Sequence, residues 1–562
     1  MIGTKIQGFW HSTRAGFVLA MLAMSWGVQA QNAWTVETPL FDKAVAEMEV
    51  QTEETGRDMV GLVLPTHFDV FEHATRSVEG NFEVWTLTVE APGALATCLY
   101  FDDFHVPAGA RLWFETPQGR YSETWVEGPV TSFENNDHRR WTNNEVPGDA
   151  LVLIYEAPVG LAEAAALGVC GVGYFARHQR FPEPWMTSTE RGGSEACQVD
   201  VNCPEGDSWE CEKDAVVKLR ITQAGGIFLC SGSMVNNTAK DCRQLMLSSF
   251  HCADDAEDDD WPFFKVQFNY EFYDCGGSSS INSHTRTGVI HLTDSDDMVG
   301  NQIDGSDFLL VEVEDPIDDS WIPYFAGWDA TGFNGNNGVG IHHPSGDRKK
   351  ISTFINPLIN SNVYALGAHW RVIWASTETN HGVTETGSSG SPIFDENHRI
   401  LGTLTGGASF CDSPNSPDYY GKVSYHWDGA NPIPESMRLK AFLDPFDTGE
   451  ERVNGSYRVT DVDGNVTCDV HNACEATAVE EQFLASLTVA PNPTSGEVRV
   501  ALGNGFLTQR IQAFDALGRP LAEWEGSAIR GTLDLSLWGT GVRYITVTTT
   551  DGWSTTRRVV VQ

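Results

Sequence analysis

Three residues that lie far apart in the sequence are of the types that together hydrolyse an acyl bond. Ser389 lies in the string GSSGSP, His251 ends the apolar stretch in LMLSSFHCADD, and Asp307 precedes the leucine-rich run in GSDFLLVEV. A serine nucleophile needs a base that takes its proton, and a buried carboxylate holds that base in the right tautomer. We therefore predict that His251, Asp307 and Ser389 form a catalytic triad.

The turn around Ser389 also offers donors for the negative charge that develops in acyl transfer. Glycines flank the serine and permit a tight turn, so we expect the backbone amides of Gly387 and Ser389 to form an oxyanion hole. Each residue has an alternative when taken singly: a plain Ser/Gly surface turn, a core histidine for His251, and a strand-start cap for Asp307. The order His, Asp, Ser favours the trypsin-like arrangement over the two other known orders.

The elements that must position these residues are predicted to be strands. From 192 to 454, short apolar stretches and glycine-rich turns alternate, and sustained helical periodicity is confined to PESMRLKAFL at 434–443. We expect an all-β fold, a double β-barrel closed by one C-terminal helix. Residues 31–191 show a period of two, as in FEVWTLTV, which predicts a separate small β-rich domain.

The remaining segments predict an exported protein. Residues 1–30 combine basic residues, a short apolar run and small residues before a cleavage site, which is typical of a secretory signal peptide. Twelve cysteines favour disulfides formed outside the cytosol. No later stretch is apolar enough to predict a membrane span. Residues 455–485 predict a polar linker with little packed structure, and residues 486–562 a small β-sandwich.

The charge argues against one class of partner. The 77 acidic and 36 basic residues give a net charge of −41, which repels phosphate backbones, so we expect no nucleic-acid partner. We expect a solubilising surface, with attraction of basic substrates as the alternative, and no cofactor. The acidic run after His251 predicts a solvated loop, with a calcium site as the alternative. His342 and His343 lack a third ligand and are expected to be structural.

Residues 192 to about 450 resemble the bacterial lysyl endopeptidases, a branch of the chymotrypsin fold. Strings similar to those of the family occur in order: CQVDVNCPEGD, LCSGSMVNNTAKD, IHHPSGDRKKIS, GVTETGSSGSPIF and PDYYGKV. The resemblance implies a secreted endopeptidase that cleaves after Lys, with Arg left open, by an acyl-enzyme route. The alternatives are a protease of broader specificity and a catalytically inactive, surface-displayed binding protein.

The resemblance also implies roles for single residues. Asp418 would be the acid that binds the substrate lysine, with Asp412 as the alternative, because Val383 stands where trypsin itself has its aspartate. Three disulfides are implied: Cys197 with Cys411, Cys203 with Cys275, and Cys230 with Cys252. For the other cysteines we expect bridges of Cys211 with Cys242, of Cys98 with Cys170, and of Cys468 with Cys474.

The string STERGGSEAC resembles a maturation site of the family. Cleavage between Arg191 and Gly192 would turn residues 31–191 into a propeptide that assists folding or blocks the cleft, whereas the alternative is an ordinary exposed loop. In trypsin the new N-terminus pairs with an aspartate just before the nucleophile, but here that neighbour is Ser388. We therefore expect activation by removal of a steric block.

The last segment resembles the sorting domain of the type IX secretion system of Bacteroidetes. The strings that carry this resemblance are APNPTSGEVRV, FDALGRPL and DLSLWGTGVRYITV. They imply passage across the outer membrane with the type IX machinery as partner, followed by release or attachment to the outer cell surface. The alternative is a generic β-sandwich binding module. We expect a monomer whose other partners are protein or peptide substrates with basic residues.

Overall fold

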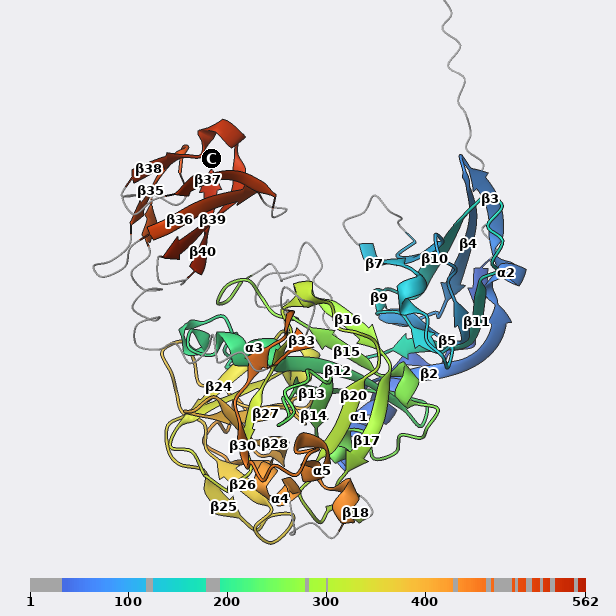
Figure 1. Cartoon of the computed structure of the whole chain (residues 1–562). Helices are drawn as coiled ribbons and strands as arrows, with labels where there is room; N and C mark the ends of the chain where they lie inside the picture. The colour runs from blue at the N-terminus through green and yellow to red at the C-terminus, as the bar shows by residue number, and fades with distance from the viewer. Residues whose placement is uncertain are drawn as a thin grey trace, which may run out of the picture.

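The computed structural model describes most of the chain between residues 33 and 561 (Figure 1). The gaps in the description are 118–124, 178–192, 278–282, 300–301, 428–432, 461–465, 469–487, 491–493, 502–507, 516–518, 526–530 and 550–553. The predicted signal peptide and the predicted cleavage site at Arg191 and Gly192 therefore lie outside the described residues. Within the described ranges, no helix has both the length and the apolar character needed to cross a bilayer.

Residues 33–177 form two sheets and one long helix. The elements are β1 (Ala33–Thr35), α1 (Phe41–Thr55), β2 (Asp58–Asp69), α2 (Val70–His73), β3 (Thr75–Glu79), β4 (Phe82–Glu90), β5 (Ala96–His105), β6 (Arg111–Glu115), β7 (Trp125–Val130), β8 (Trp141–Thr142), β9 (Val146–Pro147), β10 (Ala150–Pro158) and β11 (Ala166–Phe175). One sheet has the order β1-β4-β10-β6-β7, with β3 beside β4.

Helix α1 was missed by the sequence analysis, which predicted strands only. Its buried residues are Ala44, Met48 and Thr52, one per turn at a spacing of four, and the other positions are mostly polar. Such a narrow apolar stripe gives a weak periodic signal. The helix ends at Gly56, which has the left-handed conformation that stops helices.

A second sheet joins residues 33–177 to the following region. Its strand order is β16-β15-β12-β13-β2-β11-β5-β8, so β2 pairs directly with β13 (Gly226–Met234). The first barrel of the following region contributes β12 (Val216–Gln223), β14 (Leu245–Ser248), β15 (Lys265–Phe268), β16 (His284–Thr287), β17 (Val289–Asp294) and β20 (Leu309–Val313). The two units thus share one hydrogen-bonded sheet.

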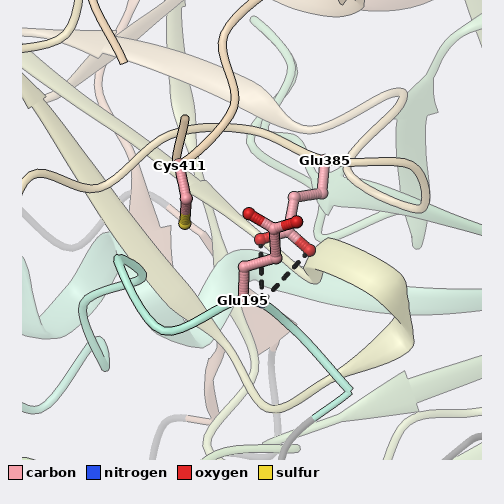
Figure 2. A group of neighbouring side chains, drawn as sticks. All are labelled: Glu195, Glu385 and Cys411. Carbon is pink, nitrogen blue, oxygen red and sulfur yellow. Dashed lines mark hydrogen bonds between the residues drawn. The ribbon is translucent and has the colours of Figure 1, made fainter. Parts of the chain in front are cut away.

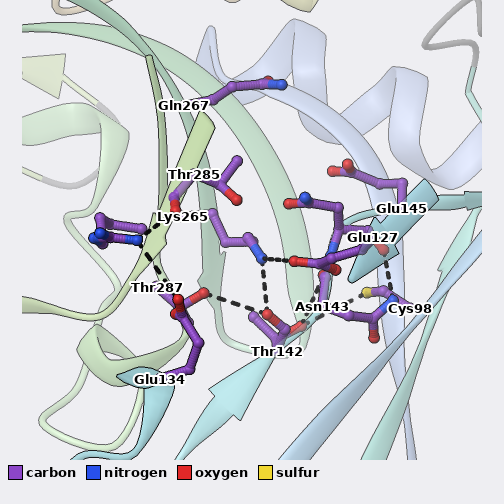
Figure 3. Close-up of polar contacts among 12 residues, drawn as sticks. Cys98, Glu127, Glu134, Thr142, Asn143, Glu145, Lys265, Gln267, Thr285 and Thr287 are labelled. Atoms are coloured by element: carbon purple, nitrogen blue, oxygen red, sulfur yellow. Dashed lines mark hydrogen bonds and ion pairs between the residues drawn. The ribbon is translucent and has the colours of Figure 1, made fainter. Parts of the chain in front are cut away.

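Buried ion pairs reinforce this junction. Lys265 donates to the carbonyl of Thr142 at 2.8 Å and lies 3.7 Å from Glu127 (Figure 3). It also sits over the ring of Trp141. Its side chain is 4% exposed. Because a buried ammonium without partners is very unfavourable, residues 33–177 must supply these partners for as long as they cover the first barrel.

A nine-stranded sheet forms the second barrel. Its main order is β24-β23-β27-β28-β29-β26-β25, with β22 and β30 at the side. The strands are β22 (Gly327–Asp329), β23 (Gly338–His342), β24 (Lys350–Phe354), β25 (Ile359–Ser361), β26 (His369–Val372), β27 (Pro392–Asp395), β28 (Arg399–Gly407), β29 (Asp418–Lys422) and β30 (Arg452–Val453). The all-β prediction is confirmed.

The predicted closing helix is interrupted. Residues 434–443 form a 3₁₀ turn at Glu435–Met437 and a short helix α5 (Leu439–Leu443), because Arg438 between them is extended. Two other short helices are α3 (Glu210–Ala215) and α4 (Val423–Trp427). Leu439 and Leu443 are fully buried and explain the apolar pattern.

The predicted linker is partly packed, so that prediction is wrong for the described residues 455–460 and 466–468. β31 (Ser456–Tyr457) pairs with β21 (Tyr324–Phe325), and β32 (Val459–Thr460) pairs with β33 (Val466–Thr467). Cys468 forms a disulfide with Cys242. This bond overturns two predictions: Cys242 is not joined to Cys211, and Cys468 is not joined to Cys474.

The remaining cysteines divide into bridged and free. The structure joins Cys197 to Cys411, Cys203 to Cys275 and Cys230 to Cys252, the three pairs implied by the resemblance. The predicted bridge between Cys98 and Cys170 is wrong, since both are free. Cys98 of β5 stands opposite Gly173 of β11, and an offset of three residues along a strand is roughly 10 Å.

Residues 488–561 form two sheets of their own. One contains β34 (Thr488–Ala490), β35 (Glu497–Ala501) and β38 (Gly531–Asp534). The other contains β36 (Thr508–Asp515), β37 (Pro520–Glu525), β39 (Gly541–Thr549) and β40 (Ser554–Val561). A small core includes Val498, Ile511, Ile545, Val547 and Val559.

Candidate active site

Strand pairing in the first barrel brings His251 and Asp307 together. β14 ends at Ser248, which pairs with Leu309, the first residue of β20. His251 comes shortly after the end of β14, and Asp307 comes just before the start of β20. The Nδ1 atom of His251 lies 2.8 Å from Oδ2 of Asp307, and the His251 backbone amide donates to Oδ1 at 2.9 Å. Because Asp307 occupies Nδ1, the other ring nitrogen of His251 is left to act as a base.

The environment of His251 favours its charged form. Burial lowers the pKa of His251, but the charge and hydrogen bond of Asp307 outweigh burial, and the net pKa lies above the ordinary value. Asp254 adds a further increase, and Arg57 opposes it. Cys252, the next residue, is tied to Cys230 of β13, so the histidine loop is fixed covalently.

Asp297, which the sequence analysis missed, holds the backbone of Asp307. Asp307 has a φ of 59°, which is rare for a residue with a side chain. Its amide donates to Oδ2 of Asp297 at 2.8 Å, and Ser295 donates to Oδ1 at 2.7 Å. Burial, followed by the charge of Asp307, raises the pKa of Asp297 to about 6. In the sequence, Asp297 belongs to the run DSDD, which looks like any exposed acidic turn.

Ser389 lies in a tight turn before β27 that only glycine can complete. A Cβ atom on Gly390 would lie 2.1 Å from the hydroxyl of Ser248. The Ser231 amide donates to the carbonyl of Ser389 at 2.8 Å and fixes the turn against β13. Among the described residues, no protein group accepts a hydrogen bond from the amides of Gly387 or Ser389. Their role as donors to an oxyanion stays a prediction.

His251 and Ser389 line one cavity of about 730 Å³. No hydrogen bond joins the His251 ring to the Ser389 hydroxyl within the described part of the chain. Such bonds are often long before a substrate binds. Because His251 and Asp307 come from the first barrel and Ser389 from the second, the site lies where the two barrels meet, as in chymotrypsin-like double β-barrels, and the fold prediction is confirmed.

Ser388, the residue before the proposed nucleophile, is held by a histidine of β23. Nδ1 of His342 lies 2.8 Å from the Ser388 hydroxyl, and the Glu385 amide donates to the same oxygen at 3.2 Å. Burial lowers the pKa of His342 to about 3, so its ring is neutral. The neighbouring His343 is within 2.9 Å of the Asp347 carbonyl. Both histidines therefore have hydrogen-bonding roles in the core.

Glu385 connects the serine turn to the segment that follows the predicted cleavage site. It accepts a hydrogen bond from the Glu195 amide at 3.0 Å (Figure 2). Gln198 and Ser345 also donate to it, at 2.6 Å and 3.0 Å. Glu195, Glu385 and Cys411 form the one cluster of metal-ligand types found among the described residues. Since Cys411 is in a disulfide, its sulfur is not a thiolate ligand.

A buried acid lies beside the same cavity. Asp418 accepts hydrogen bonds from Trp374 at 2.6 Å, Thr384 at 2.7 Å and the hydroxyl of Ser409 at 2.5 Å, and it is completely buried. Thr384 and Ser409 line the cavity. Burial raises the pKa of Asp418 despite these donors, which lower it. The alternative, Asp412, is exposed.

The cavity is covered by the N-terminal unit. Its lining includes Glu53, Glu54, Thr55 and Gly56, at the C-terminal end of α1. The next residue, Arg57, forms ion pairs with two acids of the loop that follows His251. Access to His251 and Ser389 is therefore restricted in this form of the chain.

Sequence comparisons give one family. Residues 191–421 match the family described as "Lysyl endopeptidase, C-terminal domain". The chain is similar to a lysyl endopeptidase of Pseudomonas aeruginosa, with 30% identity over 308 residues, which are 51% of this chain and 62% of that protein. The chain thus spans less than two thirds of this relative.

Comparisons with solved structures return proteases at low overall similarity. An HtrA-type protease, AlgW with a tripeptide, matches at 12% identity over 63% of this chain and 96% of its own, with a TM-score of 0.28. A Glu endopeptidase in complex with MPD matches at 14% identity over 38% and 87%, with a TM-score of 0.25. A thermostable serine protease, AL20, from an extremophilic microorganism matches at 14% identity over 38% and 92%, with a TM-score of 0.27.

Proposed function

We propose that this protein is a serine endopeptidase with His251, Asp307 and Ser389 as its triad. The main support is the pair of hydrogen bonds between His251 and Asp307, 2.8 Å to the ring Nδ1 and 2.9 Å to the backbone amide. His251 also lines the same cavity as Ser389. The match of residues 191–421 to a lysyl endopeptidase family supports the same reaction.

In this mechanism the Nε2 atom of His251 takes the proton of the Ser389 hydroxyl as its oxygen attacks the peptide carbonyl. The oxyanion accepts hydrogen bonds from the amides of Gly387 and Ser389. The imidazolium, stabilised by Asp307, then gives the proton to the leaving amine, which leaves an acyl-enzyme on Ser389. Water repeats the sequence and releases the acid.

The proposed specificity is for Lys, and also for Arg, before the cut. A lysine side chain that enters between Thr384 and Ser409 approaches Asp418, whose burial raises its pKa. An ammonium beside a buried carboxylate favours the ionised form and makes a strong charge-assisted hydrogen bond. Neutral and acidic side chains bring no cation to this carboxylate.

We propose that the chain is made as a zymogen in which residues 31–191 are the propeptide. Support comes from residues 53–56, which line the catalytic cavity. Cleavage between Arg191 and Gly192 would be the first step of activation. None of Glu53, Glu54, Thr55 and Gly56 is basic, so the covering segment does not offer the Asp418 pocket its preferred side chain.

Residues 486–562 are proposed to be a type IX sorting domain that directs the protein outside the cell. Two small antiparallel sheets with a common core are consistent with this role. Disulfides such as Cys197–Cys411 favour an oxidising compartment.

A phosphonylating reagent specific for active serines tests the central claim. The chain activated by proteolysis is expected to gain one adduct, located on Ser389 by fragment mass mapping, and to hydrolyse peptides after Lys. An activated, folded chain with no adduct at Ser389 would identify an inactive binding protein. Cleavage after many residue types would instead show broader specificity.

A further inference from the structure

An arginine side chain occupies a built site next to the proposed catalytic groups. Arg57 forms ion pairs with Asp254 and with Asp255, the latter at 3.0 Å, and its guanidinium lies 5.1 Å from the centre of the Phe228 ring. The Arg57 side chain is 7% exposed. Two carboxylates and an aromatic face are the partners that a planar guanidinium binds best.

This site adjoins the catalytic cavity on the side of the first barrel. Asp254 stands three residues after His251 in the loop fixed by the Cys230–Cys252 bond, and Phe228 lies on β13. Thr384 and Ser409, which lead to Asp418, belong to the second barrel. The two acidic sites therefore belong to different barrels.

We propose that Asp254, Asp255 and Phe228 form a second substrate subsite, which binds an arginine or lysine side chain that follows the cleaved bond. The subsite rests on the proposed function, because a peptide reaches it only once residues 33–177 have left. Arg57 then shows how the subsite is filled: main chain at Gly56 lies in the catalytic cavity, and the next side chain reaches the two acids.

The charges of the site favour binding of a second cation once Arg57 has left. When Arg57 leaves, two neighbouring carboxylates and the face of Phe228 lose their partner, and like charges repel at short range. The charges are close enough to the reacting groups to matter, since Asp254 raises the pKa of His251 and Arg57 lowers it. A basic residue of the substrate would again neutralise the two carboxylates, as Arg57 does in the uncut chain.

The test compares peptides that differ only after the cut. Activated enzyme is given quenched fluorescent peptides with Lys before the cut and with Arg, Gln or Glu at the first, second or third position after it. Arg at one of these positions is expected to raise kcat/KM about tenfold over Gln, mainly through KM, because a charge-assisted contact is stronger than a neutral one even where solvent screens part of it. Glu is expected to be worst.

Variants assign the effect to the site. The ratio of kcat/KM for the Arg peptide to that for the Gln peptide is expected to approach one in two variants. These are Asp255→Asn, which changes a half-exposed side chain, and the double variant that also carries Asp254→Asn. The control Asp258→Asn removes one charge from an exposed position of the same loop and is expected to keep the ratio. The ratio is taken within each variant, with active enzyme counted by the phosphonylating reagent.

The outcomes separate this proposal from the one on which it rests. Equal rates for Arg and Gln in the wild-type enzyme overturn the subsite, and so does a preference that survives the double variant or appears only before the cut. Absence of hydrolysis of every Lys peptide overturns the proposed function itself.

Discussion

Asp297 holds the backbone amide of Asp307 in a hydrogen bond of 2.8 Å, although both side chains are acidic and buried. Asp307 has a positive φ of 59°, and a non-glycine residue held there costs about 1–3 kcal/mol unless its surroundings compensate. The Asp297 carboxylate supplies that compensation. The backbone of Asp307 is thereby fixed so that both carboxylate oxygens face His251.

Asp297→Ala is expected to lower kcat about 100-fold with little change in KM, because small displacements of positioned groups cost about that much. Asp297→Asn keeps an acceptor for the Asp307 amide and is expected to recover most of the rate. Asp304→Ala, at an exposed position of the same loop, is the control. A loss in Asp297→Ala that appears only in KM would contradict a positioning role.

The pH dependence follows from the raised pKa of His251. The reaction needs the neutral imidazole, and this form is lost as pH falls through the pKa of the folded protein. The acid limb of kcat/KM is therefore expected to have its midpoint above the ordinary histidine value of about 6.5. Asp307→Asn removes the cause of the shift and is expected to move this limb to lower pH, with a rate loss of about 10⁴-fold. Rate profiles between acidic and neutral pH check both claims.

Asp418→Asn is expected to lower kcat/KM for Lys peptides by about 10²–10³-fold, since breaking a buried ion pair costs about 3–5 kcal/mol. Stability is expected to stay the same or rise, because burial already disfavours the ionised Asp418. Asp412→Asn, at an exposed position, is the matched control. Kinetics on Lys and Leu peptides with thermal unfolding of each variant measure both effects; equal loss on both peptides would point to damage of the whole site.

The alternation of apolar stretches and glycine-rich turns predicted the strands of both barrels, and the role of the site residues stays a prediction. Partners contributed by distant segments escaped sequence analysis. His251, Asp307 and Ser389 each lie in a short string of distinctive composition next to an apolar stretch. Local sequence was therefore enough to select them as candidates. Asp297 contacts Asp307, 10 residues away in the sequence, and Arg57 contacts Asp254, 197 residues away. Neither Asp297 nor Arg57 lies in a string of unusual composition. The Cys242–Cys468 bond likewise joins segments 226 residues apart, which cysteine counting alone cannot pair.

The junction between the N-terminal unit and the first barrel leads to a prediction about activation. β2 and β13 share a ladder of backbone hydrogen bonds, and the pairs Lys265–Glu127 and Arg220–Glu145 lie buried beside it. Arg220 is 3% exposed and its partner Glu145 has a pKa lowered to about 2, since the cation outweighs burial. Salt screens buried pairs far less than exposed ones.

A single cut at residue 191 is therefore expected to leave the two pieces bound to each other. The Ser389→Ala chain, cut in trans by a small amount of active enzyme, is expected to elute from a sizing column as one species, even at 1 M salt. Glu145→Gln in the cut chain is expected to separate the pieces at lower denaturant, because it leaves Arg220 without its carboxylate partner. Arg76→Gln, in an exposed pair with Glu83 of the same unit, is the matched control. If the cut Ser389→Ala chain, with no other change, runs as two separate species in dilute buffer, the ladder and ion pairs do not hold the pieces together, and cleavage alone would open the cavity around residue 389.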